Sequence, residues 1–177
     1  LLQHGYEYCI VDAGWSVQGH SQLIDDHGRP LPDPARWPSA GANGSLGFGP
    51  LAAKVHALGL KFGFHFWRGV LPTAVRARSP ILGAGAGVTA ADIVRNDTSC
   101  GGRSDFSMGV NMSVLPAAQL WYDSLAQLWS TWNADLVKVD CNALQRLAAR
   151  QEVFALADAL ERTAATNNST EIVYMLS

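Results

Sequence analysis

The feature of this sequence that most restricts its fold is a regular alternation of strand-like and helix-like segments. Four short runs rich in β-branched and aromatic residues have the composition of strands: YEYCIVD, LKFGFHFW, DLVKVD and EIVYML. Each of the last three follows a segment with helix-compatible spacing of apolar residues. Strands that alternate with amphipathic helices are typical of parallel βα units. Because the strand runs are mostly apolar throughout, we expect an α/β fold whose sheet is covered on both faces or closed into a barrel.

Three segments place apolar residues on one helical face before these strands. The residues on the three faces are Leu51, Val55 and Leu58; Trp121, Leu125, Leu128 and Trp132; and Val153, Leu156 and Leu160. Two long connections, at about residues 16–49 and 70–114, interrupt the alternation. Both follow strands, so they should lie at the carboxyl end of the sheet, where α/β proteins build their sites. The glycines of GAGAGV, in the second connection, are not placed between a strand and a helix, so we expect no dinucleotide site.

Composition argues against several classes of partner. With 48% hydrophobic residues, 16% charged residues and a formal net charge of -2, the chain looks globular and lacks the positive charge that nucleic acid attracts. No apolar run approaches the roughly 20 residues of a membrane-spanning helix. The cysteines Cys9, Cys100 and Cys141 have none of the spacings of a zinc or redox site. We therefore expect no nucleic acid, no membrane, no metal and no other cofactor.

The chain ends indicate how much of a domain the sequence covers, and the asparagines indicate the cellular location. The sequence enters a strand pattern almost at once and stops directly after another, so we expect an internal piece of a larger domain. Five of the seven asparagines begin an N-x-S/T acceptor sequence. These five are Asn43, Asn96, Asn111, Asn167 and Asn168. Such a proportion favours a secretory route, with a secreted, lysosomal or vacuolar location.

A lysine and an aspartate occupy the end of the strand run LVKVDC. Side chains alternate along a strand, so Lys138 and Asp140 should share one face while Val137 and Val139 share the other. A nearby ammonium would keep the carboxylate ionised, which suits a covalent nucleophile. A structural ion pair is an equally good interpretation of this strand taken alone.

Two other strand ends also carry polar groups. In CIVDAGW, Asp12 could hold sugar hydroxyls and Trp15 could stack on a pyranose ring, although this strand taken alone favours a turn cap for Asp12 and plain packing for Trp15. In KFGFHFWRG, His65 and Arg68 could face a pocket, whereas a single histidine on a strand is more often a satisfied core residue. Three consecutive strands that end in such groups favour a carbohydrate site at their shared edge.

The segments GYEYCIVDAGWS, DHGRPLPDPARWPS, LAAKVHALGLKFGFHFWRG and WNADLVKVDC occur in the order seen in one enzyme family. The chain resembles the α-galactosidase-like glycoside hydrolases, of the melibiase type (family 27 and its relatives in clan D). The resemblance implies a (β/α)8 TIM barrel followed by a β-sandwich domain. Residues 1–177 would then be part of a single catalytic barrel, covering about strands 2–5, with the rest of the barrel and the β-domain absent.

The resemblance also implies roles for the strand-end residues. Asp140 would be the nucleophile of a retaining α-glycosidase that acts on terminal α-galactosides or closely related residues. Lys138, Asp12 and Trp15 would contact the sugar. His65 lies where relatives usually have a pocket tyrosine, and Arg68 could meet an acidic or substituted sugar.

The cysteine after the nucleophile has a counterpart in the family. In relatives, the position of Cys141 joins a cysteine from the loop after the third strand. Cys100 lies in the corresponding long connection of this chain, so the resemblance implies a Cys100–Cys141 disulfide.

Departures from the family pattern leave two functions open. Relatives typically carry two adjacent aspartates where this chain has Asp12 and Ala13, and the acid/base of the family comes from a later strand. The first hypothesis is a retaining α-glycosidase whose isolated 177-residue piece is inactive. The second is a non-catalytic carbohydrate-binding relative that kept the barrel.

Overall fold

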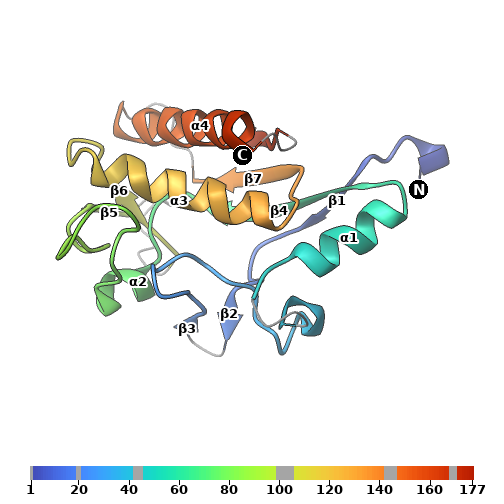
Figure 1. The fold of residues 1–177 in the computed structure, drawn as a ribbon, viewed down its shortest axis with the longest axis horizontal. Helices are drawn as coiled ribbons and strands as arrows, with labels where there is room; N and C mark the ends of the chain where they lie inside the picture. Colours follow the sequence, from blue (N-terminus) through green and yellow to red (C-terminus); the bar gives the residue numbers. More distant parts are fainter. Residues whose placement is uncertain (1, 19–20, 42–45, 99–105, 142–146, 168–170) are drawn as a thin grey trace.

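The computed structural model describes residues 2–18, 21–41, 46–98, 106–141, 147–167 and 171–177. Its centre is a four-stranded parallel sheet in the order β1-β4-β7-β8 (Figure 1). The strands are β1 (Tyr8–Val11), β4 (Lys61–Trp67), β7 (Leu136–Asp140) and β8 (Val173–Leu176). All four coincide with the predicted strand runs. Within the described residues the sheet stays open, as expected for part of a (β/α)8 barrel.

Three helices connect these strands and cover one face of the sheet. They are α1 (Gly49–Ala57), α3 (Ala117–Thr131) and α4 (Leu147–Asn167), and α3 and α4 lie side by side (Figure 1). The side chains of β4 and β7 that face the helices are fully or almost fully buried: Phe62, Phe64, Phe66, Val137 and Val139. Trp129 of α3 packs edge-on against Phe64 and Phe66, with ring centroids 5.3 and 5.0 Å apart. This aromatic layer fixes the strands on their helices and forms the core.

The opposite face of the sheet is the one that would line the interior of a barrel. Gly63 lies there between Ile10 and Leu136, and a Cβ atom at Gly63 would come within 3.2 Å of the Ile10 side chain and 3.1 Å of the Leu136 side chain. Glycine therefore lets the two neighbours approach each other across β4. On the same face, Val173 and Met175 of β8 are 46% and 41% exposed.

The two long connections contain short elements that the sequence did not predict. The remaining elements are η1 (Leu2–His4), β2 (Val17–Gln18), β3 (Ser21–Gln22), η2 (Pro38–Gly41), α2 (Pro72–Ala77), β5 (Val94–Thr98) and β6 (Met108–Val110). β2 pairs with β3 and β5 pairs with β6, both antiparallel. β3 (SQ) and β5 (VRNDT) carry mostly polar residues, and β2 and β6 have only two and three residues, so no apolar pattern identifies them. As predicted, both connections leave the carboxyl end of the sheet.

Two features of the described residues bear on partners. None of the described helices is both long enough and apolar enough to cross a membrane. Among the same residues, no group of three or more His, Cys, Asp or Glu side chains could hold a metal ion.

Candidate active site at the carboxyl end of the sheet

Three charged side chains from two strands meet at the carboxyl end of the sheet. The Nζ of Lys138 lies 3.3 Å from Oδ2 of Asp12 and 3.8 Å from Oδ1 of Asp140. β4 lies between β1 and β7, so the lysine reaches across two strand spacings, about 9.6 Å, to contact Asp12. The structure therefore brings together the three residues that the sequence placed at one edge of the sheet.

The carboxylate of Asp140 has one oxygen engaged and one without a hydrogen bond. Oδ2 lies 3.0 Å from Nε2 of His65, and the side chain of Asp140 is 23% exposed. Within the residues that the structure describes, Oδ1 is buried and accepts no hydrogen bond. A buried, unsatisfied oxygen is rare in native proteins and is usually explained by function. A carboxylate that is oriented through one oxygen and keeps the other without a hydrogen bond suits a nucleophile.

His65 is buried on β4 and serves as a neutral hydrogen-bond donor. Only 1% of the residue is exposed. Burial lowers its pKa, and the neighbouring Asp140 opposes that change only in part. Because a carboxylate only accepts hydrogen bonds, the neutral imidazole must carry its hydrogen on Nε2 to bond to Asp140. The ring also contacts Trp67 edge-on, with centroids 4.5 Å apart.

Asp12 is an ionised and open carboxylate at the end of β1. The Ala13 N–H donates to its Oδ1 at 2.7 Å, and this hydrogen bond, together with Lys138, lowers the pKa of Asp12. The turn-capping role that the sequence left open is therefore present. Oδ2 remains on the Lys138 side, and the side chain is 70% exposed. Such a group can accept hydrogen bonds from the hydroxyls of a ligand.

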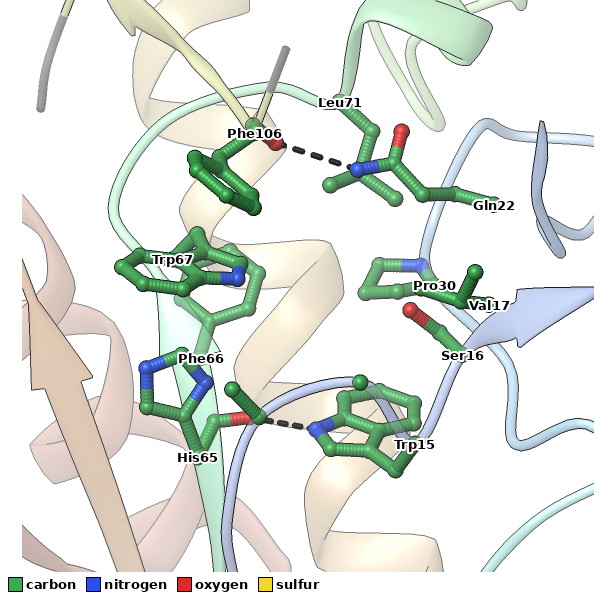
Figure 2. Close-up of a pocket in the computed structure, with 12 residues that line it drawn as sticks. Trp15, Ser16, Val17, Gln22, Pro30, His65, Phe66, Trp67, Leu71 and Phe106 are labelled. Carbon is green, nitrogen blue, oxygen red and sulfur yellow. Dashed lines mark hydrogen bonds between the residues drawn. The ribbon is translucent and has the colours of Figure 1, made fainter. Parts of the chain in front are cut away.

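A pocket of about 240 Å³ adjoins the charged residues and shares His65 with them (Figure 2). Trp67 stacks on Phe106, with ring centroids 4.8 Å apart, and Gln22 Nε2 donates to the Phe106 carbonyl at 3.2 Å. The first connection supplies the opposite wall. The residues that line the whole pocket are Ala13, Gly14, Trp15, Ser16, Val17, Gln22, Pro30, His65, Phe66, Trp67, Leu71 and Phe106. Trp67 is the register partner of Asp140 on the next strand. The pocket therefore opens beside the charged site.

Trp15 contributes to this site mainly through packing. The residue is 4% exposed, and its ring makes edge contacts with Phe48, Phe64 and Trp132 in the aromatic core. Its indole N–H donates to the His65 carbonyl at 2.6 Å, as Figure 2 shows. The N–H is thus already engaged and the ring is enclosed by other rings. Trp15 thus packs in the core, lines the pocket and supports the wall that His65 occupies, and its contact with a sugar stays a prediction.

Arg68 does not lie in the pocket, which corrects the prediction that it meets a substituted sugar. Its side chain is 3% exposed and forms an ion pair with Glu152 of α4. The reason is strand alternation: Trp67 points to the pocket side, so the next residue points to the helices. Sequence reasoning missed Glu152, although a glutamate within the apolar stripe of α4, beside Val153 and Leu156, was a signal that could have identified it.

The cysteine pairing lies beyond what the structure describes. Cys100 is outside the described residues, so a Cys100–Cys141 disulfide stays a prediction. Cys9 on β1 is exposed and free.

Comparisons with known proteins bear on the family to which the chain is similar. No family model matches the chain. A curated relative, alpha-galactosidase 3 from Hypocrea jecorina, is 24% identical over 136 residues, which are 77% of this chain and 18% of that protein.

Solved structures resemble the whole chain. A Bacillus halodurans C-125 protein assigned as an α-N-acetylgalactosaminidase superposes with a TM-score of 0.85 and 35% identity, over 100% of this chain and 42% of that one. A family 27 β-L-arabinopyranosidase from Geobacillus stearothermophilus has a TM-score of 0.85 and 35% identity, over 100% and 41%. A variant of that enzyme, solved in complex with arabinose, has a TM-score of 0.86 and 34% identity. The chain thus spans about two fifths of these solved proteins and 18% of the curated relative.

Proposed function

This chain belongs to the α-galactosidase-like glycoside hydrolases of family 27, and on that premise we propose that the full-length protein is a retaining glycosidase. Its substrates would be terminal α-galactosides or closely related residues, with Asp140 as the nucleophile. The observation that supports this most directly is the geometry of Asp140. It is oriented by His65, lies beside Lys138 and keeps one oxygen free of hydrogen bonds from the described residues.

The proposed reaction has two displacements at the anomeric carbon. In the first, the Asp140 carboxylate attacks this carbon, the bond to the leaving oxygen breaks, and a protonated carboxyl group supplies the proton to that oxygen. In the second, the same group takes a proton from water, and the water oxygen displaces Asp140 and frees the sugar. Retaining enzymes hold the two carboxyl groups about 5–5.5 Å apart. By the family resemblance, the acid/base would come from a strand outside these 177 residues.

The neighbours of Asp140 would each have a separate task. His65 would hold Oδ2 and so fix the orientation of the Asp140 carboxylate relative to the anomeric carbon. Lys138 would stabilise the ionised carboxylate and donate to a sugar hydroxyl, while Asp12 would accept hydrogen bonds from hydroxyls on the same ring. These interactions fix the ring relative to the nucleophile, which is where positioning contributes most to rate.

Ala13 affects which sugar the site would bind. A second carboxylate at this position would contact a further hydroxyl, and this chain has none there. β-L-Arabinopyranose has the ring hydroxyl arrangement of α-D-galactopyranose but carries hydrogen in place of the hydroxymethyl group. One of the structural relatives is a β-L-arabinopyranosidase. Galactosides and arabinopyranosides are therefore the two substrates to compare.

The test is hydrolysis by the full-length protein of an aryl α-D-galactopyranoside and an aryl β-L-arabinopyranoside. We expect release of the aryl group from at least one of them and retention of anomeric configuration in the first product seen by NMR. Asp140→Asn should abolish both. Activity that survives this substitution would exclude Asp140 as the nucleophile. Saturable sugar binding with no turnover would instead support the second candidate, a non-catalytic binding protein, which the loss of a carboxylate at Ala13 favours.

We also propose that the protein follows a secretory route. The support is the number of acceptor sequences, and among them Asn111 lies directly after β6 and is partly exposed. The protein isolated from its native source should shift to lower mass on treatment with an N-glycosidase. An unshifted mass, with unmodified Asn111 in peptide analysis, would count against this route.

A further inference from the structure

We propose that Arg68 and Glu152 are positioning residues that hold the main chain after Asp140 and thereby aim the nucleophile. This inference rests on the proposed function, because it requires Asp140 to react with the substrate. It concerns two groups that lie outside the sugar pocket and that act through the backbone.

Arg68 binds two consecutive main-chain carbonyls at the end of β7. Its main-chain N–H donates to the Asp140 carbonyl at 3.2 Å, one step beyond the last register pair of β4 and β7. Its side-chain Nε–H donates to the Cys141 carbonyl at 2.8 Å. A single residue of the neighbouring strand therefore fixes both peptide groups that follow the Asp140 side chain.

The turn that Arg68 holds has an uncommon conformation. Cys141 has a φ of 70°, in the left-handed region that residues other than glycine seldom adopt. Such conformations persist when the surrounding contacts determine them, and they gather at functional sites. The two hydrogen bonds from Arg68 are contacts of this kind, and a change in the turn would rotate the Asp140 side chain directly before it.

Glu152 keeps the Arg68 guanidinium in place. It is fully buried on α4 and accepts hydrogen bonds on both carboxylate oxygens. Oε1 accepts from Nη1 of Arg68 and from Nη2 of Arg95, the latter at 2.8 Å. Oε2 accepts from the Val110 N–H at 2.9 Å and from the Tyr122 hydroxyl at 2.7 Å. With donors from four elements or connections around it, this carboxylate has little freedom to move.

The contacts form one continuous path from the helices to the nucleophile. α3 and β6 fix Glu152, Glu152 fixes the Arg68 guanidinium, and Arg68 fixes the carbonyls of Asp140 and Cys141. Buried charges of this kind are strongly disfavoured when a partner is lost, so the arrangement has few alternatives. A nucleophile displaced by about 1 Å can lose about 100-fold in rate, whereas sugar binding depends on other residues.

The experiment compares variants of the full-length protein on the substrate that the wild type hydrolyses. Arg68→Lys keeps the positive charge beside Glu152 but lacks the forked donors that reach both Glu152 and the Cys141 carbonyl. We expect kcat to fall about 10- to 100-fold while KM stays within about twofold. Covalent trapping of Asp140 by a 2-deoxy-2-fluoroglycosyl fluoride should slow by the same factor, because that step reports nucleophilic attack.

The matched control is Arg162→Lys, the same substitution in another arginine–carboxylate pair of α4, in which Arg162 contacts Asp123 of α3 at 2.6 Å. It should leave kcat, KM and trapping unchanged. Glu152→Gln is the second test variant and should reduce kcat, with KM unchanged, even where Arg68→Lys does not fold. Wild-type kcat in a folded Arg68→Lys protein, or in Glu152→Gln when Arg68→Lys fails to fold, would overturn the inference.

Failure of the proposed function is distinguishable from this result. The proposed function fails if the wild type does not hydrolyse the substrates or if Asp140→Asn retains activity. In either case the inference about aiming a nucleophile fails as well. Failure of the inference alone appears as an inactive Asp140→Asn protein together with fully active Arg68 and Glu152 variants.

Discussion

Nε2 of His65 lies 3.0 Å from Oδ2 of Asp140, so two neighbouring strands each supply one partner of the hydrogen bond that orients the candidate nucleophile. The family resemblance implies that a tyrosine usually occupies the position of His65. A phenolic O–H and an imidazole N–H are both donors, so the exchange can retain the bond to the carboxylate. The imidazole donates this hydrogen bond only while Nε2 carries a hydrogen. Burial lowers the pKa of His65, so the donor is the neutral ring.

The first prediction concerns the donor on β4. In the full-length protein, His65→Phe should lower kcat/KM by about 10- to 100-fold, because a hydrogen bond to a charged group contributes about 1.5–3 kcal/mol. His65→Gln retains a side-chain N–H donor and should lose less. Steady-state kinetics of both variants on the wild-type substrate decide this. Equal kcat/KM for His65→Phe and the wild type would show that the bond does not assist the reaction.

A second prediction follows from the lowered pKa of His65. The pKa in the folded protein lies below the ordinary value of 6.5, so the unfolded chain binds the proton first as the pH falls. The free energy of unfolding should therefore decrease as the pH drops below about 6.5, and this decrease should end below the folded-state pKa. Thermal unfolding of the wild type and of His65→Gln at pH values from 8 to 5 measures the effect.

The comparison with His65→Gln isolates this residue from the other titrating groups. The wild type should lose more stability than the variant across the same pH range. Parallel stability curves for the two proteins would show that His65 has no such linkage.

The sequence predicted the strands and their polar ends, because both depend on local rules. Period-two alternation places Lys138 and Asp140 on one face, and parallel strands bring their carboxyl ends to one edge, where Asp12 follows β1. The predicted meeting of these three residues is confirmed by the 3.3 and 3.8 Å contacts of Lys138.

The surroundings of Arg68 and Trp15 depend on contacts distant in the sequence. Arg68 forms its ion pair with Glu152, 84 positions away, and the Trp15 indole donates to a carbonyl 50 positions away. Neither partner is visible from the strand on which the residue lies. The pairing of β5 with β6 was also missed, since β5 (VRNDT) carries mostly polar residues and β6 has only three residues.

The third prediction concerns the cation between two carboxylates. Lys138→Met should lower kcat/KM by about 10- to 100-fold, because the substitution removes a charged hydrogen-bond donor and leaves Asp12 and Asp140 without their shared cation. Lys61→Met is the matched control: Lys61 lies on β4 at the opposite end of the sheet and is 3.8 Å from Glu7 at the surface. The control should keep wild-type kinetics. A similar loss in both variants would argue against a site-specific role.

The fourth prediction separates two aspartates that flank the same strand. Asp140→Asn should lower kcat by about three orders of magnitude or more and leave the protein folded. Asp135, directly before β7, accepts the Phe62 N–H at 2.7 Å and contacts His56 at 2.6 Å, so its role is structural. Asp135→Asn should reduce the free energy of unfolding by about 1–3 kcal/mol and leave kcat unchanged. Circular dichroism melting and kinetics on both variants test this separation, and an inactive, fully stable Asp135→Asn protein would contradict it.

The fifth prediction concerns the sugar that the site accepts. Ala13 is exposed beside Asp12 and lines the pocket, so an added carboxylate there can reach a ligand without displacing the core. We expect Ala13→Asp to raise the ratio of kcat/KM for the α-D-galactopyranoside to that for the β-L-arabinopyranoside by about tenfold. The reason is that only galactose has a hydroxymethyl group that can donate a hydrogen bond to the added carboxylate. One such hydrogen bond contributes about 1.5 kcal/mol. Ala53→Asp, on the exposed side of α1, introduces the same charge away from the site and should leave the ratio unchanged. An unchanged ratio in Ala13→Asp would show that this position does not select between the two sugars, and selectivity would then have to come from the other walls of the pocket.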